Sequence, residues 1–265
     1  MASDSSVSSS KYSIELIPVG RGEVPGPELF WMSRFDEWLP LEFQVVLIRG
    51  DGVTALVNTG PDRDLGPMNR QWEGFLGPRA AMRREDGEFI LDQLSSRGVD
   101  PDDVTHVILS PLQLYSVSNV LAFPNAEICI STKGWVHFHT TKAHPHDDRY
   151  SCLPEHVLVP LVTSEWDRVR LLEDEDQIAP GIRSWWAGVH HRASVVVEVD
   201  TEVGVVAISD AYFWLENVTE SHPIGICENI YEAMSTYERV RRGADIVVPL
   251  YDPRNRERHE NGRIG

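Results

Sequence analysis

The sequence predicts an α/β fold in which two β-sheets pack face to face and helices cover their outer surfaces. In each half of the chain, two short β-branched runs joined by a tight turn predict a hairpin, and another segment has apolar residues at helical spacing. The 265 residues are 42% hydrophobic, which is enough for one large core. We therefore expect one domain over residues 12–265, after a disordered Ser-rich tail over residues 1–11.

The first half begins with strand signals. Residues 12–18 alternate between polar and apolar side chains, as a half-buried strand does. After a Gly- and Pro-rich loop, runs at residues 43–48 and 53–58 predict a hairpin that turns at Gly-Asp-Gly, residues 50–52. Residues 61–84 are polar and rich in Gly, Pro and Arg, and we expect a long excursion of the kind that often serves as a lid.

A helix and a buried strand follow this excursion. Apolar residues share one face of a predicted helix over residues 88–97, and Gly98 predicts its end. Residues 105–109 are a β-branched run of strand length, and residues 127–130 are a second such run. A helix that leads into a strand with polar residues at its end is typical of an α/β layer, so we expect a site at this strand end.

Two segments in the middle of the chain are open to more than one interpretation. Four histidines and two aspartates lie within residues 137–148, but their spacing gives no helix face with paired histidines. We expect a flexible, partly exposed loop over the pocket, with a metal site as the alternative. Residues 169–182 predict two strands joined by a solvated acidic turn at Glu-Asp-Glu-Asp, residues 173–176.

The second half repeats the pattern of the first. Residues 194–199 and 204–209 predict a hairpin, and Asp210 stands at the exit of its second strand. Residues 228–242 have the apolar spacing of an amphipathic helix that packs against the sheets. The last predicted strand covers residues 245–250, and we expect the charged residues beyond Pro253 to be a fraying tail.

Composition excludes several classes of partner. The chain has 41 acidic and 24 basic residues, a formal net charge of -17 that disfavours a phosphate backbone, so we expect no nucleic-acid partner. No segment approaches the roughly 18 consecutive apolar residues of a membrane-spanning helix, so we expect no membrane partner. The three cysteines show no C-x-x-C spacing, and we expect buried free thiols in a reducing cytoplasm.

Residues 104–126, VTHVILSPLQLYSVSNVLAFPNA, resemble the metal-binding segment of the metallo-β-lactamase superfamily. In that superfamily a similar strand ends in T-H-x-H-x-D-H, followed by a small residue pair, Asn and often a phrase like F-P-N-A. Aligned on the last two features, the four metal-binding positions fall on Pro111, Gln113, Tyr115 and Ser116. Proline and serine are not credible zinc ligands, glutamine is a poor one, and one tyrosine cannot replace the set.

The resemblance continues over residues 14–253 and implies a four-layer αββα sandwich. The superfamily's L-V-D-T-G phrase is L-V-N-T-G here, and the amide of Asn58 fits a loop that no longer surrounds a cation. His190 matches a zinc-binding histidine, Asp210 matches the bridging aspartate, and Tyr251 replaces the final histidine. Because only His190 and Asp210 remain of seven liganding positions, we predict no dinuclear metal site and no cofactor.

The side chains at the vacated positions favour a pocket that has been reused. A scaffold without function is expected to fill such a cavity with small or apolar residues, whereas four replacements can form hydrogen bonds: Gln113, Tyr115, Ser116 and Tyr251. His190, oriented by Asp210, is suited to act as a general base or acid, with Tyr115 or Tyr251 as second proton donor or oxyanion partner. Ser116 beside a histidine also permits a nucleophilic role, but no nucleophile elbow surrounds it.

Three hypotheses about function follow. The first is a metal-independent enzyme that acts on a small acyl, lactone or polycyclic substrate, by hydrolysis or by a proton-transfer lyase or cyclase reaction. The second is a hydrolase with one metal held by His190, Asp210 and a helper from residues 137–146. The third is a pseudoenzyme that binds a ligand or a protein partner. Substrate identity and oligomeric state stay open at this level, because many chemistries share this fold.

Overall fold

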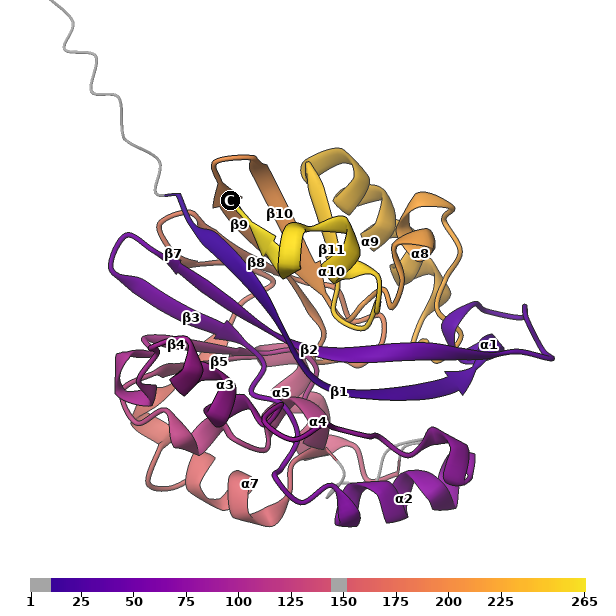
Figure 1. The fold of residues 1–265 in the computed structure, drawn as a ribbon, viewed down its shortest axis with the longest axis horizontal. Coiled ribbons are helices and arrows are strands. Elements are labelled where there is room, and N and C mark those ends of the chain that lie inside the picture. The colour runs from indigo at the N-terminus through magenta and orange to yellow at the C-terminus, as the bar shows by residue number, and fades with distance from the viewer. Residues whose placement is uncertain (1–10, 144–151) are drawn as a thin grey trace, which may run out of the picture.

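Two β-sheets lie between two groups of helices in the computed structural model, which describes residues 11–143 and 152–265 (Figure 1). The first sheet has seven strands, in the order β12 (Arg263–Ile264), β1 (Ser13–Pro25), β2 (Trp38–Gly50), β3 (Val53–Val57), β4 (His106–Leu109), β5 (Glu127–Ser131) and β6 (Val169–Leu172). The second has five, in the order β11 (Ile246–Pro249), β10 (Gly204–Ser209), β9 (Val195–Thr201), β8 (Ile182–Trp186) and β7 (Glu175–Ala179). The tail over residues 1–10 lies outside the described residues.

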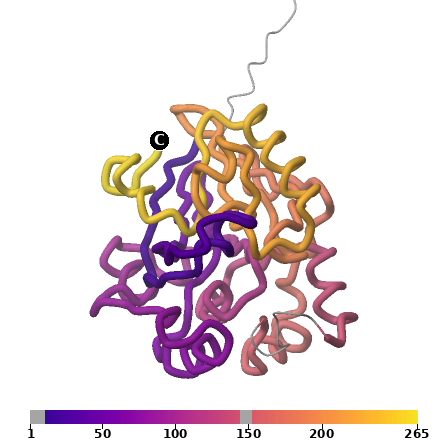
Figure 2. Tube along the Cα trace, turned by 90° about the vertical axis from the view of Figure 1, so that its right-hand side faces the viewer, coloured from indigo at the N-terminus to yellow at the C-terminus, as the bar shows by residue number. Residues whose placement is uncertain are grey.

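Helices cover both outer faces of this pair of sheets. Beside the seven-stranded sheet lie α3 (Ile90–Ser96), α4 (Leu114–Val117), α5 (Thr132–Thr140) and α7 (Glu155–Leu161), and beside β10 and β11 lie α8 (Leu215–Thr219) and α9 (Ile230–Gly243) (Figure 1). Figure 2 shows the same separation from the side, with the orange and yellow second half of the chain above the purple and pink helices. The predicted four-layer αββα sandwich is therefore confirmed.

The strands form where the sequence has β-branched and aliphatic runs. β3, β4, β5 and β6 pair in parallel, and Val107, Ile108 and Leu109 of β4 are fully buried. Parallel strands that are covered on both faces carry such continuous apolar runs. Buried side chains from both sheets join in one hydrophobic core. At about 25 cal/mol per Å² of buried apolar surface, this core supplies the main free energy that holds the sheets together.

Both predicted hairpins are present, as β2–β3 and β9–β10. The Gly- and Pro-rich loop expected before the first hairpin is wrong, because β1 and β2 pair as far as Pro25 and Trp38, across a bulge after Pro18. Glycine here makes room for a neighbour: a Cβ on Gly20 would lie 2.5 Å from Met82 Sδ. A glycine inside a strand often marks such a close approach and not a turn.

The excursion over residues 61–84 carries a helix, α2 (Gly66–Leu76). The Asn69 side chain joins α2 to the end of the excursion. Its amide donates to Met82 O and its oxygen accepts from Met82 N, both at 2.9 Å. A bridge between Arg21 and Arg83 then ties the end of the excursion to β1. The excursion is thus ordered, and its role as a lid stays a prediction.

The histidine-rich segment is a helix over its first part, so the predicted loop is wrong there. α5 begins after Ser131, whose hydroxyl accepts a hydrogen bond from Gly134 N at 3.2 Å. Trp135 and Phe138 are buried on the inner face, and this apolar pair at i, i+3 gives the segment its packing. The later part of this prediction, which includes His144 and His146, lies outside the described residues.

The acidic segment at residues 173–176 does not turn a hairpin, which corrects the prediction for residues 169–182. β6 is the edge of the seven-stranded sheet and β7 is the edge of the five-stranded sheet, so the acidic residues cross from one sheet to the other. Asp176 pairs with Arg170 at 2.5 Å and Glu175 with Arg239 at 2.7 Å. Local charge predicted a solvated tip, whereas two of these carboxylates form ion pairs, one with Arg170 on the preceding strand and one with Arg239 far along the chain.

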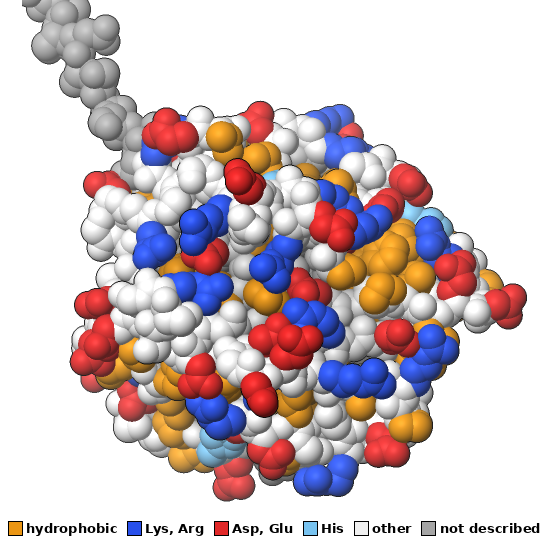
Figure 3. Space-filling model, in the orientation of Figure 1, with side chains coloured by type: hydrophobic (Ala, Val, Ile, Leu, Met, Phe, Trp, Pro, Cys, Tyr) orange, Lys and Arg blue, Asp and Glu red, His pale blue; other side chains and the backbone are white. Residues whose placement is uncertain are grey.

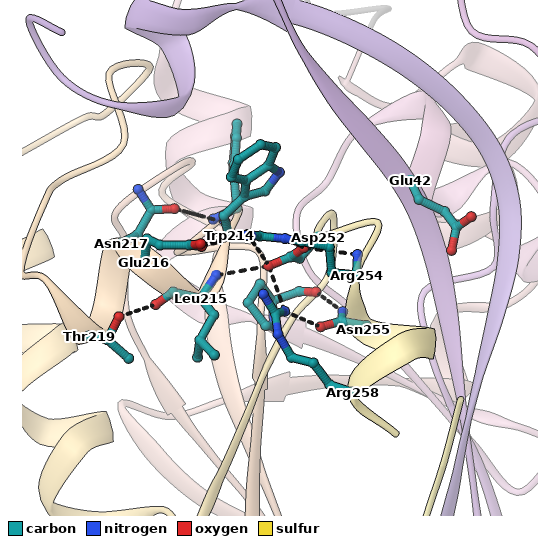
Figure 4. A network of polar contacts seen from close by, with 12 residues as sticks. Glu42, Trp214, Leu215, Glu216, Asn217, Thr219, Asp252, Arg254, Asn255 and Arg258 are labelled. Atoms are coloured by element: carbon teal, nitrogen blue, oxygen red, sulfur yellow. Dashed lines mark hydrogen bonds and ion pairs between the residues drawn. The ribbon is translucent and has the colours of Figure 1, made fainter. Parts of the chain in front are cut away.

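The residues after Pro253 are ordered, so the predicted fraying tail is wrong. They form α10 (Asn255–Arg258) and β12, which pairs with β1 and is the last strand. Figure 4 shows the anchor, in which the buried Asp252 carboxylate accepts hydrogen bonds from Leu215 N, Arg254 and Arg258 at 2.7 to 3.1 Å. Burial would raise the pKa of Asp252, but the two arginines lower it below its usual value, so it stays ionised.

The surface shown in Figure 3 has acidic and basic side chains interspersed. Among the described residues, no helix is long and apolar enough to span a bilayer. All three cysteines are free thiols, as predicted. Cys129 is also buried as predicted, whereas Cys152 and Cys227 are half-buried. Burial raises the pKa of Cys129 to about 12 and that of Cys227 to about 11, which keeps both thiols protonated and unreactive.

Candidate active site

A buried carboxylate, Asp210, is the centre of the candidate site. It directly follows β10 and accepts hydrogen bonds from Ser110 Oγ and Ser194 Oγ, each at 2.5 Å, and from His190 Nδ1 at 3.1 Å. Ser110 follows β4 of the seven-stranded sheet and Ser194 precedes β9 of the five-stranded sheet. The carboxylate therefore connects the ends of two sheets at one point.

The hydrogen bonds to Asp210 also define the tautomer of His190. Burial would raise the pKa of Asp210, but the hydrogen bond and charge of His190 and the two serine hydroxyls lower it below its usual value. An ionised carboxylate only accepts hydrogen bonds, so Nδ1 carries a proton in either state; when the imidazole is neutral, its lone pair is therefore on Nε2. This is the arrangement of a general base oriented by a carboxylate.

Asn58 holds the strand end from which Ser110 comes. Its amide donates to Ser110 O at 2.7 Å and its side-chain oxygen accepts from Ser110 N at 2.8 Å. An ionised aspartate has no donor for the first of these bonds. The amide of Asn58 is therefore matched to the backbone of Ser110.

His190 lines a cleft beneath α2 whose empty volume, counted out to its open mouth, is about 870 Å³. The lining is mainly apolar and aromatic, with a few polar groups: Gln71, Gln113, Tyr115, Glu23, Glu28, His190, His191 and Tyr251. The cleft therefore has the composition of a site for a small organic molecule.

Two tyrosines stand beside His190 in this cleft. The ring centre of Tyr251 lies 6.2 Å from that of His190 and 6.1 Å from that of Tyr115. The Tyr251 hydroxyl is buried beside the side chain of Tyr115. Burial, and then the proximity of Tyr115 and Asp210, raises the pKa of Tyr251 well above its usual value. Tyr251 thus remains a neutral phenol, suited to donate a hydrogen bond and unsuited to release its proton.

The structure brings four of the six predicted site residues to the cleft wall: Gln113, Tyr115, His190 and Tyr251. Asp210 lies behind His190, which it orients. Ser116 does not line the cleft; it is buried in α4, where its backbone oxygen accepts hydrogen bonds from the backbone and hydroxyl of Thr59 at 2.7 and 2.9 Å. Its position favours a structural role over a nucleophilic one.

Sequence reasoning missed two polar groups of the site. Ser194 was treated only as the start of a strand, and nothing in its neighbourhood signals that its hydroxyl reaches Asp210. Glu28 of α1 (Gly26–Leu29) falls in the segment that was predicted as a loop. Burial raises the pKa of Glu28 to about 7. A carboxylate flanked by apolar residues between two strands is the only signal that the sequence offers.

Among the described residues, the side chains around Asp210 do not form a ligand set that fits a metal centre. Within residues 11–143 and 152–265, no group of three or more His, Cys, Asp or Glu side chains is placed to hold an ion. The two oxygens of Asp210, which would bridge two ions in the superfamily pattern, instead accept hydrogen bonds from hydroxyls and imidazole. At the aligned positions, tyrosine and glutamine offer weak donors to zinc.

No protein-family model and no curated protein matches the chain, but solved structures do. An N-acyl homoserine lactone hydrolase, with its product bound at the catalytic metal center, has a TM-score of 0.78 at 19% identity, over 94% of this chain and 96% of that one. The hydrolase AbOPH of the beta lactamase superfamily has a TM-score of 0.68 at 14% identity, over 92% and 88%. AidC, a dizinc quorum-quenching lactonase, has a TM-score of 0.64 at 14% identity, over 96% and 93%.

These comparisons define the class of fold. The chain has the metallo-β-lactamase-like fold over nearly its whole length, so the predicted resemblance is confirmed at the level of fold. At most of the positions that the sequence resemblance aligns with metal ligands, this chain has hydroxyl, phenol or amide groups.

Proposed function

We propose that this protein is a metal-independent acid/base enzyme that acts on a small organic substrate, with hydrolysis of a lactone or another acyl compound as the reaction. The observation that carries the proposal is the Asp210–His190 pair, which presents an oriented imidazole to a cleft lined by two tyrosines. The lactonases among the structural neighbours favour hydrolysis, although those proteins work with metal. A lyase or cyclase reaction that moves a proton would use the same groups.

In the hydrolytic reaction, His190 Nε2 takes a proton from water while the water oxygen attacks the acyl carbon. Asp210 stabilises the imidazolium that results, because its buried carboxylate lies 3.1 Å from Nδ1. The negative charge on the acyl oxygen is stabilised by a hydrogen bond from the hydroxyl of Tyr251 or Tyr115. The C–O bond then breaks and the leaving alkoxide takes the proton from Nε2, which restores the neutral imidazole.

A screen of lactones and aryl esters with chelator-treated protein tests this proposal, with His190→Ala as the main variant. A positioned general base contributes about 10² to 10⁴ in rate, so we expect a loss of that size. His156→Ala, at an exposed position on α7, is the matched control and should leave turnover unchanged. Near-normal turnover of both His190→Ala and Asp210→Asn would contradict the proposal and move the chemistry to other cleft residues.

Ligand binding without chemistry is the second candidate, favoured by the aromatic lining of the cleft. Binding of a substrate analogue by a protein that turns over nothing in the screen would select this alternative. A single-metal hydrolase needs a further ligand from the histidine-rich segment, part of which lies outside the described residues. If added metal restores turnover to the chelated protein, the single-metal hydrolase is the correct hypothesis.

A further inference from the structure

The cleft beside His190 has an unusual combination of rings and charge. Six aromatic side chains line it: Phe43, Trp72, Phe75, Tyr115, Phe213 and Tyr251. Phe43 lies 5.7 Å from Trp72 and 5.2 Å from each tyrosine ring, so the rings form one continuous wall. The faces of aromatic rings attract organic cations through their quadrupoles, most strongly where water is excluded.

The same cleft contains a carboxylate with no counter-charge. Glu28 lines the cleft, and no described residue forms a hydrogen bond or an ion pair with its carboxyl group. The other acidic residue of the lining, Glu23, is already paired with Arg79 at 2.6 Å. No lysine or arginine is among the described residues that line the cleft. The electrostatic field inside is therefore suited to a positive ligand.

The backbone around Glu28 holds this group in a fixed place. Glu28 O accepts hydrogen bonds from Gly225 N at 2.8 Å and Ile226 N at 3.2 Å. The contact is close enough that a Cβ on Gly225 would lie 1.5 Å from Pro27 O, which only glycine avoids. The backbone that carries Glu28 is therefore fixed at the wall of the cleft.

We propose that the cleft selects substrates carrying an organic ammonium group, which Glu28 pairs with while the aromatic wall encloses its alkyl substituents. This inference rests on the proposed function, because it names the substrate class of the same site. Burial makes the Glu28 carboxyl costly to ionise in the unliganded cleft, with a pKa of about 7. A bound cation supplies the missing counter-charge, so the ionised form becomes the favoured one in the complex.

A matched pair of probes tests the charge alone. 4-(Hydroxymethyl)benzyl trimethylammonium and 4-neopentylbenzyl alcohol have the same shape, because a quaternary carbon replaces the quaternary nitrogen. Their affinities for the full-length protein are measured by titration calorimetry at about pH 8.5, where Glu28 is ionised. We expect the ammonium probe to bind about tenfold more tightly or better than the neutral one.

Glu28→Gln keeps the size of the side chain and removes its charge. In this variant we expect the preference for the ammonium probe to fall about fivefold or more, with the remainder due to the aromatic wall. Glu202→Gln, at an exposed position in the β9–β10 turn, is the control and should leave the preference unchanged. Melting curves establish that each variant is folded.

Three results would overturn the inference. They are equal affinity for the two probes, a preference that Glu28→Gln leaves intact, or no binding of either probe at millimolar concentration. The proposed function is judged separately, by turnover of His190→Ala. A protein with the expected ammonium preference but full turnover after His190→Ala would contradict the acid/base mechanism and leave the substrate class standing.

Discussion

Replacing Glu28 by glutamine should stabilise the protein relative to the unchanged chain. This gain in stability should be larger at alkaline pH than at acidic pH. Burial raises the pKa of Glu28 from 4.5 to about 7. The folded state therefore holds this proton more tightly than the unfolded state, and stability falls as pH rises from about 4.5 to about 7. Glutamine cannot ionise, so the variant does not suffer this loss.

The size of the effect follows from the shift in pKa. One pKa unit corresponds to about 1.4 kcal/mol, which gives an upper limit of about 3 kcal/mol above pH 7. Part of this difference already exists at pH 5, and the side chain keeps some contact with solvent, so about 2 kcal/mol should separate pH 5 from pH 8. For a chain of this length the difference in melting temperature is about 5 °C.

Thermal unfolding followed by circular dichroism at pH 5 and pH 8 measures this difference. The quantity of interest is the change in melting temperature caused by Glu28→Gln at each pH, with Glu202→Gln as the exposed control. A gain at pH 8 that shrinks at pH 5 is the expected pattern. An identical effect at both values, or a loss of stability at pH 8, would refute the reasoning about burial of this carboxyl.

Three further predictions concern the site. Protein purified without chelator should carry well under one equivalent of zinc, iron or manganese by elemental analysis, and stoichiometric metal that tracks activity through chelation and add-back would contradict this. Of Tyr115→Phe and Tyr251→Phe, the variant that loses the oxyanion donor should lose about 10² in kcat while the other changes little, and equal small effects would remove the phenols from the mechanism. Ser110→Ala and Ser194→Ala should each lower the free energy of unfolding by about 1 to 3 kcal/mol, because the buried Asp210 carboxylate loses a hydrogen-bond donor. Denaturant titration measures this free energy, and an unchanged value would mean that water replaces the hydroxyl.

Those parts of the fold that depend on local pattern were predictable from the sequence. The hairpins and the β4 strand follow from β-branched runs and turn residues, whose signals lie within a few positions of one another. The two-residue strand β12 carries no such signal, because it exists only through pairing with β1 at the other end of the chain. The partners of β6 and β7 also carry no local signal. The acidic residues between them predict the turn of one hairpin, whereas the two strands belong to separate sheets.

Some residues of the candidate site could likewise be predicted from the sequence, and others could not. The positions of His190, Asp210 and Tyr251 could be predicted because the superfamily phrases keep their order along the chain. Ser194 and Glu28 could not, since a hydroxyl or carboxyl gains its role from what lies across the fold and not from its neighbours in sequence. The hydrogen bond of Ser194 and the burial of Glu28 are therefore visible only in three dimensions.

The hydrogen bonds around Asp210 also bear on how this chain can change over evolutionary time. A single histidine introduced at a vacated ligand position would meet a carboxylate whose oxygens already accept hydrogen bonds from Ser110, Ser194 and His190. Opening a place for an ion requires losing those donors first, and each loss leaves a buried charge poorly compensated. Stability would thus fall before any metal affinity is gained, so a single substitution is a costly first step from this hydrogen-bonded arrangement toward a metal site.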